Sequence, residues 1–198
     1  MRRLYVDRPT MMDFFDRLQA SFTGHGKLYL VGESMLVYEG WSNRTRRLEY
    51  AAQVDPGERE LFAQIVNRLA DEMGIAVYEE SPADVIPLPK GFQDRCRPTS
   101  GGPSGPLEIA HFDPYSVAFR LVTRGDEPDY RTVLAILEKG WITVEGMNGL
   151  LSGLLPRFNK ETIAQDPAEF RRKYRGLLQM WRMMSKKVHR EDDQKAVI

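Results

Sequence analysis

The first half of the chain alternates short apolar runs, typical of strands, with longer segments whose apolar residues recur at helical spacing. Five large apolar side chains between Pro9 and Phe22 mark one face of the first helix. The pattern predicts a helix over 9–22, a strand over 28–31, a short helix ending at 40, a strand over about 48–54, a helix over 55–74 and a strand over 75–78. Strands and helices that alternate through short links indicate an α/β core.

The second half of the chain is predicted to be mainly helical. One more strand, Leu107–Phe112, is expected first, and helical spacing then recurs over 115–122, 130–137 and 147–155. The third of these helices is expected to end at Pro156, because proline interrupts a helical hydrogen-bond ladder. The last helix is the longest, since its apolar residues step by four and three from Phe170 to Val188 as one continuous seam.

Length, charge and cysteine content narrow the class of protein. The 198 residues fit an α/β domain over 1–125 followed by a helical C-terminal region over 126–198. Lys plus Arg and Asp plus Glu both number 28, so nucleic-acid binding would need a local basic patch. Cys96 is the only cysteine, which excludes an internal disulfide. No apolar run approaches the ~18–20 residues of a membrane span, and we expect a cytoplasmic protein without membrane contact.

Leu28–Val54 is the stretch with the clearest chemical character. An apolar strand enters the turn Gly32-Glu33-Ser34, which opens a short helix. Backbone N–H groups at such a turn are available to an anion, and the helix dipole favours negative charge there. A basic loop with Arg44, Arg46 and Arg47 follows before the next strand. The stretch therefore predicts a site for an anionic ligand.

Three segments give the chain a resemblance to a known family. They are Gly32-Glu33-Ser34 after a strand, Arg44-Thr45-Arg46-Arg47-Leu48-Glu49 leading into the next strand, and Asp113-Pro114-Tyr115 before the helical region. Their order resembles the G-[GS]-S, R-x-T-x-D-[IL]-D and D-P-Y layout of bacterial nucleotidyltransferases of the minimal and abortive-infection types. The resemblance covers Leu28 to about Leu137. It implies a small mixed sheet with flanking helices, followed by an all-helical C-terminal part.

The resemblance also implies roles for individual residues. In this family the Gly/Ser turn holds nucleotide phosphates, paired acids hold two magnesium ions, and a third carboxylate comes from a later strand. Glu49 and Asp113 are therefore the candidate catalytic residues and magnesium ligands. The candidate nucleotide- and phosphate-binding residues are Gly32, Ser34, Arg44, Thr45, Arg47 and Arg120.

Two positions depart from the family pattern where metal binding is concerned. Arg47 stands in place of the first acid of the pair, and Glu33 adds a carboxylate to the phosphate turn. Side chains two residues apart on a strand share a face, so a D-x-D pair offers two oxygen ligands to one cation. Arg47 would instead pair with Glu49 or bind a phosphate directly. A rearranged cluster of Glu33, Glu49 and either Asp113 or Glu108 is the alternative.

Several candidates have a structural interpretation of equal or greater weight. Asp113, followed by proline, is typical of a helix N-cap. Asp129 matches an acid of the family or caps the next helix, and Arg120 lies in the cleft or is a surface charge. His111 is a conceivable general base, although a single histidine at a strand end is more often structural.

The last helix carries a basic face beside its apolar seam. Its Lys and Arg residues are Arg171, Arg172, Lys173, Arg175, Arg182, Lys186, Lys187 and Arg190. The first interpretation is a core or dimer seam with a solvated charged side. The second is a surface for RNA or a protein partner, because clustered basic residues attract phosphates.

Three functional hypotheses follow from these residues. The leading one is a catalytically impaired nucleotidyltransferase homologue that binds nucleotide, nucleic acid or a protein partner without standard magnesium-dependent transfer. The second is an active, divergent enzyme that uses magnesium to add a nucleotide to RNA or protein in a toxin–antitoxin or phage-defence system. The third is a scaffold or antitoxin-like module, or a homo-oligomer, that acts through Phe170–Val188.

Overall fold

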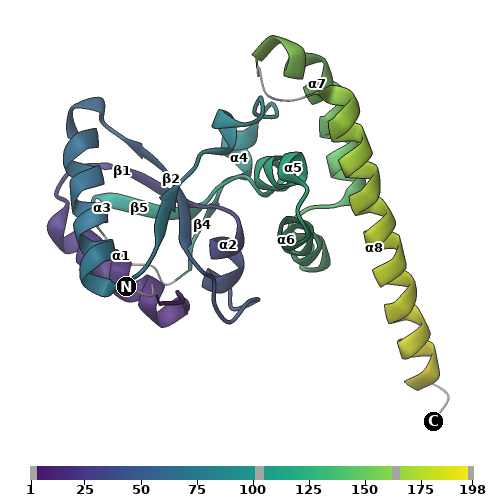
Figure 1. Ribbon diagram of the computed structural model, residues 1–198, viewed down its shortest axis with the longest axis horizontal. Coiled ribbons are helices and arrows are strands. Elements are labelled where there is room, and N and C mark those ends of the chain that lie inside the picture. The colour runs from purple at the N-terminus through teal and green to yellow at the C-terminus, as the bar shows by residue number, and fades with distance from the viewer. Residues whose placement is uncertain (1–3, 101–104, 162–165, 196–198) are drawn as a thin grey trace.

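The computed structural model describes residues 4–100, 105–161 and 166–195. The protein is mixed α/β and 60% helical, with one five-stranded sheet and a helical C-terminal part. In Figure 1 the sheet lies between α1 and α3 on one side and α2 and the later helices on the other. The expected α/β class, mixed sheet and helical C-terminal part are confirmed.

The sheet has the strand order β3-β2-β1-β5-β4. Its strands are β1 (Gly26–Leu30), β2 (Leu48–Val54), β3 (Val77–Glu79), β4 (Arg97–Pro98) and β5 (Leu107–His111). β1 runs parallel to β5 and antiparallel to β2, β2 runs parallel to β3, and β4 runs antiparallel to β5. The centre of the sheet is therefore β1, which delivers the chain directly into the Gly32 turn.

Eight α-helices accompany the sheet among the described residues. They are α1 (Arg8–Ser21), α2 (Glu33–Tyr38), α3 (Arg59–Met73), α4 (Phe92–Arg95), α5 (Pro114–Arg124), α6 (Glu127–Glu138), α7 (Val144–Glu161) and α8 (Pro167–Lys195). α1 and α3 form the core on one face, where Phe22 meets Phe62 edge-on with ring centroids 5.3 Å apart. Aromatic packing of this kind stabilises the layer beyond the area that it buries.

The helix that was expected to end at Pro156 continues through that residue. α7 extends from Val144 to Glu161, with Pro156 inside it. Leu154 and Phe158, on either side of the proline, are both buried in the core. Tertiary burial of these side chains outweighs the backbone hydrogen bond that Pro156 removes, so the sequence-based prediction was wrong at this point.

The apolar seam of α8 is only partly covered within the chain. Phe170, Tyr174 and Leu177 are buried against the rest of the protein, whereas Met184 is 39% exposed. Figure 1 shows the C-terminal half of α8 extending beyond the other helices. The side chains of 186–195, including Val188 and three of the basic residues, lie outside the described part. None of the helices in the described ranges combines the length and apolarity needed to cross a bilayer.

Candidate functional site

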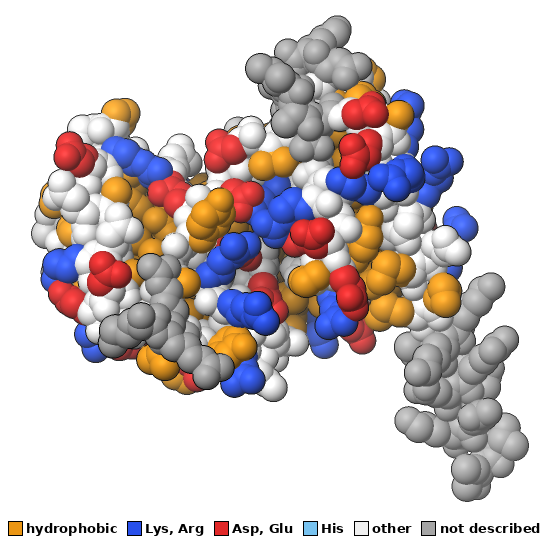
Figure 2. All heavy atoms as spheres, in the orientation of Figure 1, with side chains coloured by type: hydrophobic (Ala, Val, Ile, Leu, Met, Phe, Trp, Pro, Cys, Tyr) orange, Lys and Arg blue, Asp and Glu red, His pale blue; other side chains and the backbone are white. Residues whose placement is uncertain are grey.

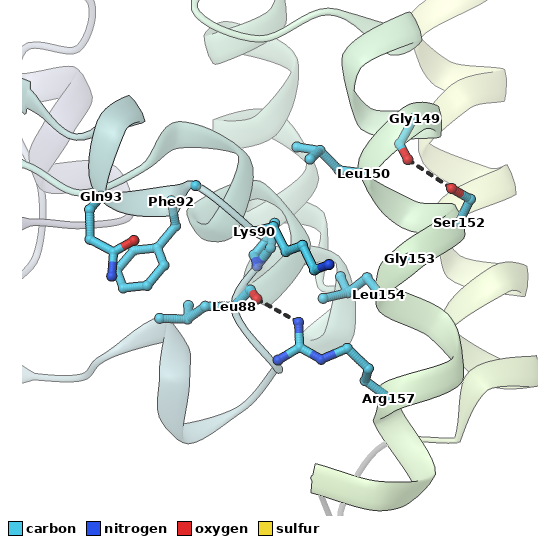
Figure 3. Close-up of a pocket in the computed structure, with 12 residues that line it drawn as sticks. Leu88, Lys90, Phe92, Gln93, Gly149, Leu150, Ser152, Gly153, Leu154 and Arg157 are labelled. Atoms are coloured by element: carbon cyan, nitrogen blue, oxygen red, sulfur yellow. Dashed lines mark hydrogen bonds between the residues drawn. The ribbon is translucent and has the colours of Figure 1, made fainter.

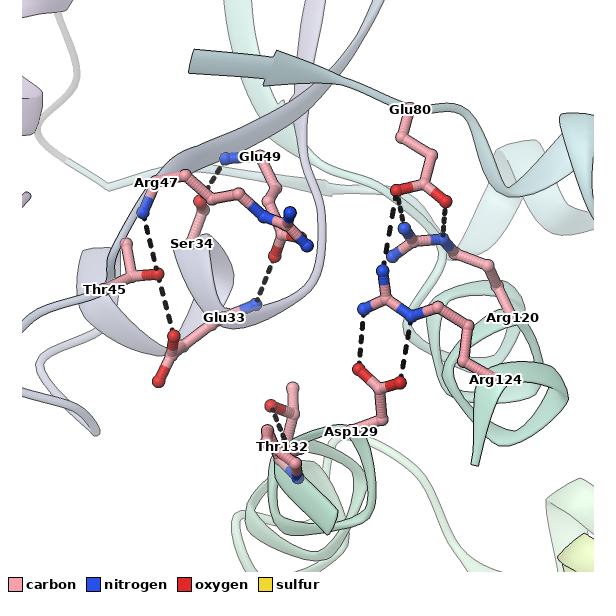
Figure 4. A network of polar contacts seen from close by, with 11 residues as sticks. Glu33, Ser34, Thr45, Arg47, Glu49, Glu80, Arg120, Arg124, Asp129 and Thr132 are labelled. Atoms are coloured by element: carbon pink, nitrogen blue, oxygen red, sulfur yellow. Dashed lines mark hydrogen bonds and ion pairs between the residues drawn. The ribbon is translucent and has the colours of Figure 1, made fainter. Parts of the chain in front are cut away.

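A cleft of about 620 Å³ lies where β2 and the start of α2 face α5 and α6. It is lined by Tyr5, Glu33, Arg44, Thr45, Arg46, Arg47, Glu49, Leu121, Arg124, Pro128, Asp129 and Thr132. Figure 2 shows Lys and Arg side chains gathered with Asp and Glu over the middle of the molecule, between the sheet and the helical region. The polar contacts of the cleft are drawn in Figure 4.

The Gly32 turn brings α2 and β2 into direct contact. Gly32 has φ of +59°, and a Cβ at this position would collide with the carboxylate of Glu49. The Glu33 backbone N–H donates to Glu49 Oε2 at 3.2 Å, and the Glu49 N–H donates to Ser34 Oγ at 2.7 Å. The chain's own carboxylate therefore occupies the place beside the turn where a phosphate was expected. Ser34 is fully buried and holds the backbone of β2.

Arg47, immediately before β2, forms an ion pair with Glu49, the second residue of that strand. The Arg47 Nε donates to Glu49 Oε1 at 3.1 Å, and Nη2 lies 2.9 Å from the same oxygen. The Glu49 side chain is 6% exposed and that of Arg47 is 41% exposed. The spacing of two residues predicted this contact, which forms although Arg47 stands just before the strand. Arg47 thus neutralises Glu49 and still faces the cleft.

Glu33 contributes a second carboxylate that has a different partner. The hydroxyl of Thr45 donates to Glu33 Oε2 at 2.8 Å, and the Arg47 N–H donates weakly to the same hydroxyl oxygen at 3.4 Å. No ion pair of Glu33 occurs among the described residues. Arg44 and Arg46 at the cleft mouth are exposed and likewise form no ion pair within the described part of the chain.

Two arginines of α5 lie opposite β2: Arg124 lines the cleft, and Arg120 lies behind it. Arg120 is fully buried, and its Nε donates to Glu80 Oε1 at 2.9 Å while Nη2 contacts the other oxygen of Glu80. Its Nη1 is buried without a hydrogen-bond partner. Burial, together with the neighbouring Arg124, lowers the pKa of Arg120 to about 10. In Figure 4 the guanidinium groups of Arg47, Arg120 and Arg124 all point toward the space between β2 and α5.

Asp129 joins the cleft as the partner of Arg124. Arg124 donates from Nε and Nη2 to the two Asp129 oxygens at 2.9 and 2.6 Å, and this contact raises the pKa of Arg124. Asp126, not Asp129, occupies the N-cap position of α6. The interpretation of Asp129 as that cap was therefore wrong.

Asp113 lies apart from the cleft and is used for structure. It accepts from Arg95 Nε and Nη2 at 3.0 and 2.9 Å, and from the backbone N–H groups of Tyr115 and Ser116. The Ser116 hydroxyl donates to it as well, at 2.7 Å, and Asp113 is completely buried. The N-cap predicted from Asp113-Pro114 is confirmed. A carboxylate with these contacts has no accessible oxygen for a metal ion.

The rearranged metal cluster is not formed. Glu108 pairs with Lys27 at 2.8 Å, near the start of β1, whereas Glu49 neighbours Val31 beyond its end. Four residues of strand separate these levels, which is roughly 13 Å. In the described ranges, no three His, Cys, Asp or Glu side chains are grouped to hold a metal ion. The donor set that is present does not fit a pair of magnesium ions.

His111 is buried in an aromatic environment beside α2. Its Nε2 lies 2.7 Å from Glu39 Oε1, and the rings of Tyr38 and Trp141 contact it edge-on. Burial lowers the pKa of His111 despite the opposing effect of Glu39. It does not line the cleft, so the geometry supports the structural interpretation over the general base.

A second cavity, of about 480 Å³, lies between the segment 88–93 and α7 (Figure 3). Its walls are largely apolar, and Arg157 Nη1 closes one side by donating to the Leu88 carbonyl at 2.7 Å. The described residues around it include no carboxylate and none of the predicted site residues. Among the described residues, the first cleft therefore gathers predicted site residues that this second cavity lacks.

Six of the eight predicted site residues come together at the first cleft. Gly32, Ser34, Arg44, Thr45, Arg47 and Glu49 surround or line it, Arg120 lies behind it, and Asp113 stands elsewhere. The prediction missed Arg124 and Glu80. Arg124 follows Arg120 by four residues, so the shared helix face gave a signal for it. Glu80 follows a short edge strand, and nothing in its local sequence marks it.

Comparison of the chain with protein-family models, with curated proteins and with solved structures found no match.

Proposed function

We propose that this protein is a nucleotidyltransferase-like protein with an eroded metal site, and that its cleft binds a nucleotide through the phosphates without magnesium-dependent transfer. The order of elements supports the resemblance on which this rests. A strand enters the Gly32 turn, α2 leads to β2 with its Arg47–Glu49 face, a helix and a parallel strand follow, and Asp113 precedes the helical region.

The observation that carries the proposal is the ion pair between Arg47 and Glu49. Two carboxylates at these positions would attract divalent cations, whereas a guanidinium beside a carboxylate removes one ligand and cancels the charge of the other. Asp113 offers no replacement, because Arg95 and three local hydrogen bonds satisfy its oxygens. The residues of this site therefore do not fit magnesium.

Arginine side chains supply the positive charge that a metal would otherwise provide to a phosphate. Arg47 and Arg124 line the cleft, and Arg120 has a buried Nη1 without a partner behind them. Guanidinium groups form paired, charge-assisted hydrogen bonds with phosphate oxygens. A phosphate between these groups would compete with Glu49 and Asp129 for Arg47 and Arg124. We therefore expect binding to weaken as ionic strength increases.

Calorimetric titration of the protein with nucleoside triphosphates in the presence of EDTA tests the proposal. We expect saturable binding, and Arg47→Ala should weaken it roughly tenfold or more, because a charge-assisted contact is lost. Arg68→Ala, on α3, is the matched control, since Arg68 pairs with Glu72 on an exposed surface. Binding that requires magnesium, or that Arg47→Ala leaves unchanged, would contradict the proposal.

The active-enzyme alternative has its own assay. The protein is incubated with labelled nucleoside triphosphates, magnesium or manganese, and tRNA or protein acceptors. We expect no label transfer. Transfer that Glu49→Ala abolishes would establish the divergent enzyme instead.

The exposed end of α8 favours the interaction module as a second candidate function. Met183 and Met184 are 68% and 39% exposed on a helix whose earlier seam residues are buried. Deletion of the segment from 178 onward should then abolish an oligomer or complex on a sizing column. An unchanged apparent mass, beyond that of the deleted residues, would exclude this role.

A further inference from the structure

Two tyrosine side chains stand at the edge of the cleft, each beside an arginine. The Cζ of Arg44 lies 4.4 Å from the ring centroid of Tyr5, and that of Arg47 lies 5.0 Å from the ring centroid of Tyr78. Both tyrosines are 47% exposed. A large ring that is held by a cation yet left half accessible is a platform on which another flat group can stack.

The fold places both rings along one edge of the sheet. Val6 forms a β-bridge with Thr45, and Leu4 forms one with Ile75. Tyr5 therefore lies between the loop that contains the three arginines and the segment that leads into β3. Tyr78 is the register partner of Glu49, and its side chain therefore shares a sheet face with Glu49 and Arg47. Ile75, the bridge partner of Leu4, precedes Tyr78 by three residues, or roughly 10 Å along an extended chain.

Positive charge accompanies the two rings. Arg44 and Arg46 are exposed and form no ion pair among the described residues, and the Arg47 side chain is 41% exposed although it pairs with Glu49. We call Tyr5, Arg44, Arg46, Arg47 and Tyr78 the Tyr–Arg rim. The protein has no net charge, so this local concentration is what an anionic partner would meet.

We infer that the Tyr–Arg rim binds single-stranded nucleic acid, with bases stacked on Tyr5 and Tyr78 and phosphates on the three arginines. Two separate rings and three arginines exceed what one nucleotide can occupy. A duplex hides the faces of its bases, whereas a single strand presents them to aromatic side chains. An acidic peptide would use the arginines and leave the rings without a role. The inference deepens the proposed function and rests on it for the cleft that the rim borders.

Fluorescence anisotropy with a labelled single-stranded RNA of about twelve nucleotides tests the rim, in EDTA and across a salt titration. We expect binding that weakens with salt, and Tyr5→Ala or Tyr78→Ala should each weaken it by about 5- to 100-fold. Tyr78→Trp should retain binding, because an aromatic face remains. Arg46→Ala should reduce the slope of log affinity against log salt by about 0.7.

Matched controls come from α3, on another part of the surface. Leu61→Ala removes an apolar side chain that is 52% exposed, and Arg68→Ala removes an exposed arginine. Both variants should bind the RNA as the parent protein does. If the tyrosine variants behave like Leu61→Ala, stacking is refuted.

Competitors decide between partners, and nucleotide titrations separate the two proposals. The proposal that the Tyr–Arg rim binds single-stranded nucleic acid would be refuted by any of three results. These are no RNA binding at any salt concentration, equal binding of duplex RNA, and equal competition by polyglutamate. If Arg47→Ala weakens ATP binding while neither tyrosine variant changes RNA binding, RNA binding at the rim is refuted and the proposed function is retained. If the tyrosine variants weaken RNA binding while ATP does not bind, nucleotide binding in the cleft is refuted and RNA binding at the rim is retained.

Discussion

The end of β5 and the start of β2 each carry an arginine–carboxylate pair, and the two pairs differ in what remains accessible. At the end of β5, Asp113 is completely buried and accepts hydrogen bonds from Arg95, two backbone N–H groups and a hydroxyl. At β2, Glu49 is buried as well, but its partner Arg47 has a side chain that is 41% exposed and lines a cleft.

The buried pair at Asp113 can act only in stability, whereas the half-exposed pair at Arg47 is available for the binding that we propose. The Asp113–Arg95 pair closes the start of α5 and has no capacity left for a ligand. The Arg47–Glu49 pair leaves guanidinium N–H groups directed at solvent beside Arg124. A ligand can therefore exchange with Glu49 at β2, whereas at β5 it would have to break a helix cap.

Asp113→Ala should lower the free energy of unfolding by about 3 kcal/mol. The change removes an N-cap and leaves Arg95, whose side chain is only 26% exposed, without its counter-charge. Urea denaturation measures the loss. Asp113→Asn, which can still cap α5 but cannot neutralise Arg95, should cost about half as much. A loss below ~1 kcal/mol for Asp113→Ala would show that the end of β5 is not the closed structural pair described above.

Gly32→Ala should lower the free energy of unfolding by about 2 kcal/mol. Gly32 has φ of +59°, a conformation that strains any residue with a Cβ, and the added methyl collides with Glu49. In a Gly32→Ala, Glu49→Ala double variant the collision disappears while the backbone strain remains. Urea denaturation of both single variants and the double variant should therefore show that the double variant loses less stability than the sum of the two single losses. Strict additivity would mean that Glu49 does not rest against the turn.

Local patterns in the sequence were sufficient for the elements that form both strand ends. Leu48–Val54 was predicted with the observed bounds of β2. Asp113-Pro114 predicted the start of α5, because an aspartate followed by proline is typical of a helix N-cap. The Arg47–Glu49 contact also followed from a spacing of two residues on a strand. Each of these features depends on residues that are close in the chain.

The remaining features depend on partners that are far apart in the chain. Nothing near Asp113 shows that Arg95 will neutralise it, and Glu80 meets Arg120 across forty residues. The two-residue strand β4 exists only because β5 pairs with it. The core, not the local sequence, likewise decides that α7 continues through Pro156. Tertiary packing overrides local preference in these places.

Acidification should destabilise the β5 end through His111, by less than the two substitutions above. Burial and the nearby Arg97 lower the pKa of His111 below its usual value of about 6.5, against the opposing effect of Glu39. The unfolded chain then takes up a proton that the folded chain resists, so the free energy of unfolding decreases as pH falls below about 6.5. Urea denaturation at several pH values should show a shallower decrease for His111→Gln. A decrease as steep in His111→Gln as in the parent protein would contradict this prediction.

Replacing the arginine of each ion pair by alanine compares the two pairs directly. The smallest loss of stability is expected at β2. Arg47→Ala should cost about 1 kcal/mol or less, because its side chain is largely solvated and Glu49 keeps the Glu33 N–H. Arg95→Ala should cost more, since it leaves the completely buried Asp113 without a counter-charge. Nucleotide affinity in EDTA should follow the reverse order, falling for Arg47→Ala and not for Arg95→Ala. If both variants lose stability and affinity in parallel, the two pairs have one structural role, and exposure of the arginine does not mark the binding site.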